Sequence, residues 1–389
     1  MTESVDLAVV GSGPVGATLA LALAGSGFNS VVLEARPADA PVNDRRTLAL
    51  SEASRQILQR LGVWPALAAG ATPISTIHVS QRGGLGRTVL RADELGRPQL
   101  GHVLRYAALC RALDQAMAAR GIAVRYGTRV VGLQPQPDRI RVISDVTAES
   151  GGLQAKLAVL ADGGRGLAEA AGLRRETTEY RQHAVVGQLS CEIDHGYVAY
   201  ERFTPQGPVA LLPDGPRSFA LVWTATPEES EVLLGLPDAA FLQRLHAHFG
   251  DRAGTFLDIR GRAAYPLKLS RVRPVVSERL VVIGNAAQTL HPVAGQGFNL
   301  GLRDAWELAL MLRDATPDQL GEAALLNVYQ SRRKPDTTGG MLFTDFLART
   351  FANDLPGLAG MRGLGLGLTE LVPPVKRFLA DRMSFGANG

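Results

Sequence analysis

A glycine-rich motif near the N-terminus, GSGPVG, constrains the fold of this chain more than any other feature. It follows the apolar run DLAVV and precedes VGATLALALAGSG, whose spacing predicts a helix, and SVVLEA, which predicts a second strand. In such a unit Gly11 permits a tight turn, Gly13 lets backbone approach a pyrophosphate, and Gly16 allows helix and strand to pack closely. Glu34 ends the second strand, about twenty residues further on, where a carboxylate accepts hydrogen bonds from a ribose. The motif therefore predicts a site for a dinucleotide, either FAD or NAD.

Length, charge and cysteine content narrow the class of protein. At 389 residues the chain is longer than one hydrophobic core ordinarily supports, so we expect two domains. The net charge of +4 comes mostly from scattered arginines, which argues against binding nucleic acid because such a site needs clustered basic residues. Cys110 and Cys191 lie far apart, so we expect a reducing compartment and neither a disulfide framework nor a metal site.

The uncharged segment from Leu7 to Leu33 is long enough to resemble a signal peptide or a membrane span. The leader MTESVD is acidic, however, whereas an export signal begins with basic residues. The glycines of the motif would also interrupt a spanning helix early. We therefore expect a cytoplasmic protein.

The middle of the chain changes from helical to strand-like patterns. Between Ala184 and Trp223, runs such as AVVGQLSCEI and SFALVW alternate with Gly, Pro and Asp turns, which predicts an antiparallel sheet. The segment RLVVIGNAA then returns to a buried strand that ends in glycine. We predict an α/β fold in which a mostly antiparallel β-sheet substrate domain is inserted into a Rossmann-like domain, with a C-terminal helical region. The expected boundaries are 1–75, 100–178 and 275–330 for the dinucleotide-binding domain, 76–99 and 179–274 for the sheet domain, and 331–389 for the helical region.

Two further strands end in glycines. LAVLADGG ends in Asp162 and Gly163, and GNAAQTLHPVAGQGFNLG, residues 284–301, follows a third apolar strand. An NAD-dependent dehydrogenase needs one dinucleotide fingerprint, whereas a flavin extends beyond the pyrophosphate and can contact further loops. The three glycine-rich strand ends together favour FAD.

In this order and spacing, the three motifs resemble those of the flavoprotein aromatic hydroxylases with a single FAD domain. Within that family, five segments are most similar to those of the hydroxylases of ubiquinone biosynthesis, especially the 2-octaprenyl-6-methoxyphenol hydroxylase type. They are GNAAQTLHP, ERFTPQGPVALLP, RAAYPL, IHVSQRG and DRRTLALS. The resemblance extends over essentially the whole chain, more loosely toward the C-terminus.

The resemblance implies an FAD-dependent monooxygenase. By this resemblance, NAD(P)H would reduce FAD, O2 would add to the reduced ring, and the flavin hydroperoxide would hydroxylate the ring of a prenylated phenol. Because such a substrate resides in the bilayer, the resemblance also implies peripheral contact with the inner membrane or membership of a ubiquinone-biosynthesis protein complex. Two alternatives remain open: hydroxylation of another aromatic or another ring position, and a flavin-binding scaffold within a quinone-biosynthesis complex.

The resemblance also implies a set of site residues. Arg46 and Arg105 contact the cofactor, and Asn285 stands where an Asp bonds the ribityl chain. Pro292 lies against the flavin ring, and the following helix N-terminus stabilises negative charge on the reduced ring by about 0.3 to 2 kcal/mol. Tyr265 is a candidate for the substrate wall, with a core tyrosine as the equal alternative. The full FAD-binding set is Gly11, Gly13, Pro14, Gly16, Glu34, Arg46, Arg105, Asp162, Gly163, Asn285, Pro292, Gly295, Gly297 and Asn299.

The chain departs from the family pattern at several positions. Gln288 replaces a His, and Gly166 and Glu169 replace a Ser and an Arg, which weakens any claim for those side chains. His291 falls on a variable family position, so a packed or capping role is favoured over a catalytic base. No catalytic residue is predicted.

Overall fold

Strand β1 (Ser4–Val10), helix α1 (Pro14–Ala22) and strand β2 (Ser30–Leu33) form the predicted strand–helix–strand unit. They belong to a computed structural model that describes residues 3–42, 44–84, 86–146, 152–204, 206–291, 295–351, 367 and 369–386. Apart from Asp6, β1 is apolar from Val5 to Val10, as expected of a strand buried on both faces. The unit lies at the centre of the first sheet.

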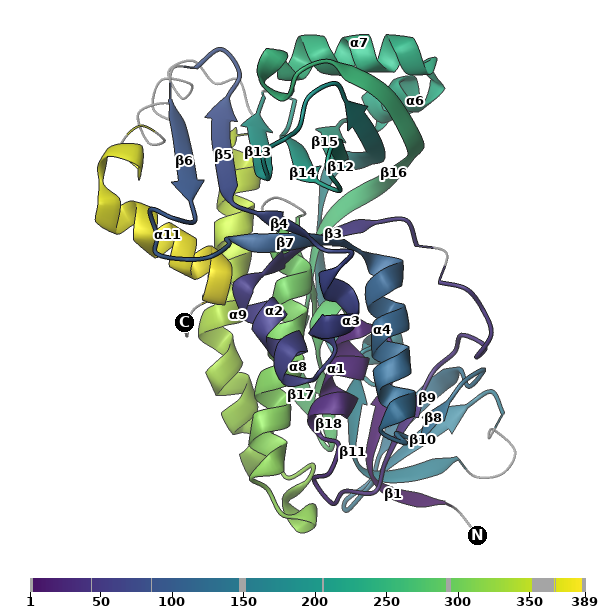
Figure 1. Ribbon diagram of the computed structural model, residues 1–389. Coiled ribbons are helices and arrows are strands. Elements are labelled where there is room, and N and C mark those ends of the chain that lie inside the picture. Colours follow the sequence, from purple (N-terminus) through teal and green to yellow (C-terminus); the bar gives the residue numbers. More distant parts are fainter. Residues whose placement is uncertain are drawn as a thin grey trace.

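The first sheet has the order β17-β18-β11-β1-β2-β8, in which β18, β11, β1, β2 and β8 run parallel. Strands β9 and β10 form an antiparallel extension from β11. Helices α1, α4 and α8 cover one face of the sheet, and α9 lies alongside α8 (Figure 1). The remaining bounds are β8 Val124–Arg125, β9 Val130–Pro135, β10 Ile140–Ser144, β11 Leu153–Leu160, β17 Val276–Ser277, β18 Leu280–Val282, α4 Tyr106–Ala119, α8 Gln296–Arg313 and α9 Ala323–Phe351.

The second sheet has the order β19-β16-β12-β15-β14-β13-β5-β6. Every neighbouring pair is antiparallel except β13 and β5. Helices α6 and α7 cover its outer face, at the top of Figure 1. The bounds are β5 Thr76–Gln81, β6 Arg87–Arg91, β12 Arg174–Cys191, β13 Val198–Phe203, β14 Val209–Pro213, β15 Ser218–Ala225, β16 Phe256–Arg273, β19 Gln288–Thr289, α6 Pro227–Gly235 and α7 Asp238–Phe249.

A small third sheet and the C-terminal helices complete the molecule. Strands β3, β7 and β4 pair in that order, and α11 packs against α2 and β3. The bounds are β3 Thr47–Ser51, β4 Thr72–Ile74, β7 Gly101–Arg105, α2 Glu52–Arg60, α3 Trp64–Ala68, α5 Leu167–Ala170 and α11 Pro373–Phe385, with short 3₁₀ turns at Asp251–Ala253, Gly284–Ala286 and Pro317–Gln319.

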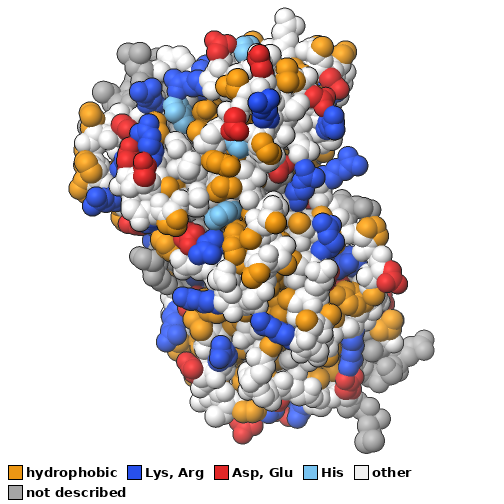
Figure 2. All heavy atoms as spheres, viewed as in Figure 1, with side chains coloured by type: hydrophobic (Ala, Val, Ile, Leu, Met, Phe, Trp, Pro, Cys, Tyr) orange, Lys and Arg blue, Asp and Glu red, His pale blue; other side chains and the backbone are white. Residues whose placement is uncertain are grey.

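The predicted α/β architecture with a separate, mostly antiparallel sheet is confirmed, whereas the exact domain boundaries stay a proposal. Strands β5 and β6, which precede the main run of sheet strands by about a hundred residues, join the second sheet. Among the described residues, helices long and apolar enough to cross a bilayer are absent. Acidic and basic side chains are interspersed over the face drawn in Figure 2.

Candidate active site

A cavity of about 2920 Å³ lies between the first sheet and the second. Ligand pockets usually measure about 300 to 1,000 Å³, so this one has room for a dinucleotide and a second molecule. Its walls come from the loops after β1, β2, β11 and β18, from the start of α8, and from one face of the second sheet. Of the predicted cofactor and substrate residues, the cavity is lined by Gly11, Gly13, Pro14, Glu34, Arg46, Arg105, Asp162, Gly163, Asn285, Gly295, Gly297 and Tyr265.

The three glycines of the first motif have different local requirements. Gly11 has φ +102°, and a Cβ there would lie 2.6 Å from the carbonyl oxygen of Ala161 on the neighbouring strand end. A Cβ at Gly16 would lie 2.0 Å from the carbonyl oxygen of Gly11, so this residue packs beneath the loop instead of lining the cavity. At Gly13, in contrast, a Cβ would meet no described atom within 4 Å. Gly13 is also the N-cap of α1, which leaves amides of the first turn facing the space where an anion would bind.

Glu34 is held in place by the same loop. Its Oε2 accepts hydrogen bonds from the backbone N and the Oγ of Ser12, at 2.7 and 2.8 Å, and its Oε1 accepts one from the backbone N of Arg36 at 2.7 Å. Since each carboxylate oxygen can accept more than one hydrogen bond, the group can still bind hydroxyls in the cavity. The carboxylate is therefore oriented before any ligand binds.

Arg46 and Arg105 lie at the same end of the antiparallel β3–β7 pairing, where Thr47 pairs with Arg105. The Arg46 guanidinium donates to Asp44, with Nη2–Oδ2 at 2.5 Å, and lies 5.3 Å from the centre of the Tyr106 ring. Arg105 is more exposed and lies 3.8 Å from Asp214, which follows β14 of the second sheet. Both arginines thus carry positive charge to the boundary between the two sheets.

The Asp162–Gly163 turn is closed by its own carboxylate. Asp162 accepts hydrogen bonds from the backbone N of Gly164 and of Arg165, both at 3.1 Å. Gly163 adopts φ +76°, a conformation that favours glycine. Glu169, one of the departures from the family pattern, is ion-paired with Arg175 at 2.5 Å, so its side chain is already engaged.

The third glycine-rich segment begins helix α8 beside the cavity. Gly295 is the N-cap of α8 in the left-handed region, with φ +59°, and both it and Gly297 line the cavity. Asn285 lines the cavity from the turn after β18. Pro292, expected against the flavin ring, lies outside the described residues. The start of α8 therefore directs its free amides toward the cavity.

Comparison with known proteins identifies the family of the chain. The family model described as an FAD binding domain matches residues 4–341. The chain belongs to this FAD-binding family. It is 36% identical to ubiquinone hydroxylase UbiL of Rhodospirillum rubrum, covering 96% of this chain and 87% of the relative. It is 33% identical to 3-demethoxyubiquinol 3-hydroxylase of Escherichia coli (strain K12), covering 96% and 97%.

The solved structures agree with this family in fold. The crystal structure of p-nitrophenol 4-monooxygenase PnpA from Pseudomonas putida DLL-E4 matches with a TM-score of 0.78 over the full length of both chains, at 17% identity. The predicted family, fold class and FAD cofactor are thus confirmed. The protein is an FAD-dependent monooxygenase, with NAD(P)H as the co-substrate typical of the family.

Asn299 has a different place in this FAD-binding protein from the one the sequence suggested. It does not line the cavity; its Oδ1 accepts hydrogen bonds from the backbone N of Ser51 at 2.9 Å and the Oγ of Ser54 at 2.7 Å. Its Nδ2 donates to the carbonyl oxygens of Ala49 and Gly295, both at 2.9 Å. The side chain ties the start of α8 to the β3–α2 connection, so its support of the FAD site is indirect.

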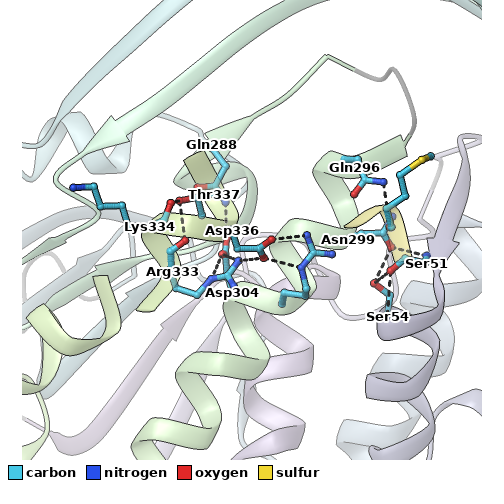
Figure 3. Close-up of polar contacts among 12 residues, drawn as sticks. Ser51, Ser54, Gln288, Gln296, Asn299, Asp304, Arg333, Lys334, Asp336 and Thr337 are labelled. Carbon is cyan, nitrogen blue, oxygen red and sulfur yellow. Dashed lines mark hydrogen bonds and ion pairs between the residues drawn. The ribbon is translucent and has the colours of Figure 1, made fainter. Parts of the chain in front are cut away.

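A buried charge network behind the cavity was not predicted. Asp304 of α8 accepts a hydrogen bond from Gln288 Nε2 at 2.6 Å and pairs with Arg333 of α9 at 2.8 Å (Figure 3). It also accepts a hydrogen bond from the backbone N of Gly284 at 3.1 Å. Burial raises the pKa of Asp304, an effect that the Arg333 charge opposes. Gln288, the residue in place of the family His, therefore anchors the third glycine loop to α8. In the sequence, this network is indicated only by Asp304, an acid on the otherwise apolar face of the helical segment NLGLRDAWELAL.

His291 is packed in the protein interior. Its side chain is about 1% exposed and meets the Tyr180 ring edge-on, with ring centres 5.1 Å apart. Burial lowers its pKa to about 4. At neutral pH the imidazole is therefore uncharged and a weak base. Its position is the packed one that the sequence favours over a catalytic base.

His291 should make the fold sensitive to mild acid. The unfolded chain protonates this His near its ordinary pKa of 6.5, whereas the folded protein resists protonation down to about 4. The free energy of unfolding should therefore fall as the pH drops from 6.5 to 4, by up to about 3 kcal/mol from this residue. Urea unfolding of wild type and His291→Gln at pH 7 and pH 5 checks this. An equal loss of stability in both proteins would contradict it.

Proposed function

We propose that the protein hydroxylates the ring of a prenylated phenol of the 2-polyprenyl-6-methoxyphenol type in ubiquinone biosynthesis. The observation that carries the proposal is that one cavity joins the three glycine-rich loops to an apolar wall on the second sheet. The names of the two relatives, ubiquinone hydroxylase and 3-demethoxyubiquinol 3-hydroxylase, support hydroxylation in ubiquinone biosynthesis, whereas the methoxyphenol substrate rests on the sequence resemblance. A substrate seated on the sheet wall would face a cofactor held by the loops.

The loops fit FAD on geometric grounds. The space above Gly13 suits a pyrophosphate, which the start of α1 would bind through its amides. We propose that Glu34 accepts hydrogen bonds from the adenosine ribose, Asn285 bonds the ribityl chain, and the N-terminus of α8 faces the flavin ring. FAD would supply the redox chemistry, taking electrons from NAD(P)H and activating O2 by the route set out for the family. The chain's own residues bind, orient and exclude water.

The second sheet would bind the substrate. Its cavity face is largely apolar, which suits a prenyl chain and limits the access of water to the reacting atoms. Tyr265 of β16 is 44% exposed and lines this wall, so we retain it as a candidate substrate contact.

We also propose that the protein acts at the cytoplasmic side of the inner membrane, where a prenylated substrate is found. Four large apolar side chains on or beside the last two helices support a peripheral contact. Leu342, Phe346, Leu371 and Phe378 are 66, 61, 78 and 65% exposed. Side chains of this kind partition favourably into a lipid interface.

Anaerobic reduction tests the proposal. With excess NADPH and no oxygen, 2-farnesyl-6-methoxyphenol should accelerate bleaching of the bound flavin, and admission of air should yield a ring-hydroxylated product. 2-Methoxyphenol, which lacks the prenyl chain, is the control ligand. It should accelerate bleaching only at much higher concentrations, since each buried CH₂ contributes about 0.8 kcal/mol to binding. Bleaching and product are read by flavin absorbance and mass spectrometry. A flavin that is neither bleached faster nor coupled to product would instead indicate another substrate or a scaffold.

A further inference from the structure

Strand β13 places a carboxyl group on the cavity face of the second sheet. Side chains alternate between the faces of a strand, so Ala199, Glu201 and Phe203 share one face, and all three line the cavity. Tyr200 packs edge-on against Phe249 of α7, with ring centres 5.5 Å apart, on the covered outer side. Glu201 therefore faces the space assigned to the substrate.

The surroundings of Glu201 are apolar. On the paired strands it lies opposite Val79 of β5 and Ala210 of β14. Within the part of the chain that the structure describes, the carboxyl group has neither a hydrogen bond nor an ion pair, and its remaining accessible surface faces the cavity. The nearby wall is formed by Ile77, Leu90, Leu212, Ala220 and Val222.

An unpaired carboxyl in such a place is costly for folding, because burial of a polar group without a partner is unfavourable. Burial also raises the pKa of Glu201 to about 7, so that both protonation states are populated near neutral pH. A base is most effective when its pKa lies near the working pH. The charged or titratable groups that line the cavity from other elements are Glu34, Arg36, Asp44, Arg45, Arg46, Arg105, Tyr106, Cys110, Arg111, Arg129, Asp162, Arg165, Asp214, Arg260, Arg262 and Tyr265.

We propose that Glu201 is a catalytic residue that binds the phenolic hydroxyl of the substrate and accepts its proton. This inference rests on the proposed function, because it assumes a phenol on the sheet wall. The phenol O–H bond breaks, its electron pair stays on the phenol oxygen, and the proton forms an O–H bond with the carboxylate. Nothing is oxidised or reduced in this step. The phenolate is more electron-rich at its ortho and para carbons, which prepares the ring for attack on an electrophilic oxygen.

Glu201→Gln tests the inference in the FAD-loaded enzyme. It keeps the shape of the side chain and removes the base. With 2-farnesyl-6-methoxyphenol, kcat/KM of wild type should rise with pH around a midpoint of about 7. The variant should lose about 100-fold or more in product formation, together with that midpoint. Glu231→Gln, the same change at an exposed position of α6, should keep the wild-type rate and profile.

A binding measurement under anaerobic conditions adds a readout without turnover. Wild type should bind the farnesylated phenol more tightly as the pH rises through 7, since the carboxylate then accepts the hydroxyl hydrogen. The O-methyl ether of the same compound has no proton to give and should show no such change. In Glu201→Gln the two ligands should behave alike across the pH range, as followed by perturbation of the flavin absorbance.

The outcomes separate this inference from the proposed function. If wild type forms product and Glu201→Gln matches its rate and pH profile, the role of Glu201 is refuted and the proposed function stands. If wild type forms no product, but binds the phenol and its O-methyl ether with different pH dependence and Glu201→Gln does not, the proposed function fails and Glu201 remains the phenol acceptor. If wild type fails to bind the phenol at all, both are refuted.

Discussion

Gly16→Ala is expected to abolish retention of FAD. The new Cβ would lie 2.0 Å from the carbonyl oxygen of Gly11, a backbone atom that cannot move without displacing the loop. Overpacking at such a contact costs about 3 kcal/mol, and a loop shift of this kind would weaken FAD binding about 100-fold. The measurement is the absorbance of flavin that remains bound after gel filtration, together with the thermal unfolding midpoint of the FAD-free protein. We expect both to fall.

Gly13→Ala is the matched variant, because it adds the same methyl group where the protein leaves open space. The FAD-free protein should unfold at the wild-type temperature, while FAD binding weakens because the methyl group occupies the approach of the pyrophosphate. Wild-type flavin content in Gly16→Ala would show that the loop tolerates displacement. If Gly13→Ala binds FAD with wild-type affinity, the pyrophosphate does not bind beside Gly13.

Arg333→Met is expected to destabilise the protein by about 3 to 5 kcal/mol, since it leaves the Asp304 carboxylate buried without its cation. The two side chains are 4% and 3% exposed and lie 2.8 Å apart, so water cannot replace the lost partner. Because Asp304 also holds the backbone of Gly284, the third glycine loop should loosen as well. Urea unfolding of the FAD-free protein at pH 7, followed by circular dichroism, measures the loss.

Arg244→Met provides the control for this loss. It removes an arginine from the exposed pair with Glu229, where the side chains are 45% and 31% exposed. Exposed pairs contribute about 0 to 1 kcal/mol, so this variant should remain close to wild type. Adding Asp304→Asn to Arg333→Met should restore part of the lost stability, because the uncompensated charge is removed. Equal stability of the two single variants would mean that the buried pair is dispensable.

Local sequence patterns predicted the parts of the fold that depend on local requirements. The N-terminal unit has its strand, loop and helix where the glycines and apolar spacing indicated them, and the conformations at Gly11, Gly163 and Gly295 are ones that favour glycine. Such positions can be read from the sequence because the constraint lies within a few residues of the glycine itself.

Strand length could not be predicted in the same way. The strand expected to begin at Ala184 starts at Arg174, and β12 and β16 each extend over 18 residues. The additional segment, RRETTEYRQH, is polar and lacks the pattern of a buried strand. It is held as a strand because β16 supplies backbone partners along its length, a contact between residues far apart in the sequence.

The two polar sites that the sequence did not predict, the Asp304–Arg333 pair and Glu201, also depend on contacts between distant parts of the chain. Asp304 and Arg333 lie on different helices, and only their packing makes them a pair. Glu201 carried a local signal, since the alternation in VAYERF places an acid on the same face as Ala199 and Phe203. The signal could be interpreted only once that face was known to border a cavity and not solvent.

The order of strands in the first sheet has a consequence for how the protein is made. Strand β1 pairs with β11, which in turn pairs with β18, so the FAD-binding sheet joins residues near 4, 154 and 281. A ribosome adds about 5 to 20 residues per second, so β1, already paired with β2, waits about 7 to 30 seconds for β11, and β11 waits longer for β18. During that time part of the apolar surface of β1 is uncovered. We expect nascent chains to depend on chaperones and to acquire FAD only late in synthesis.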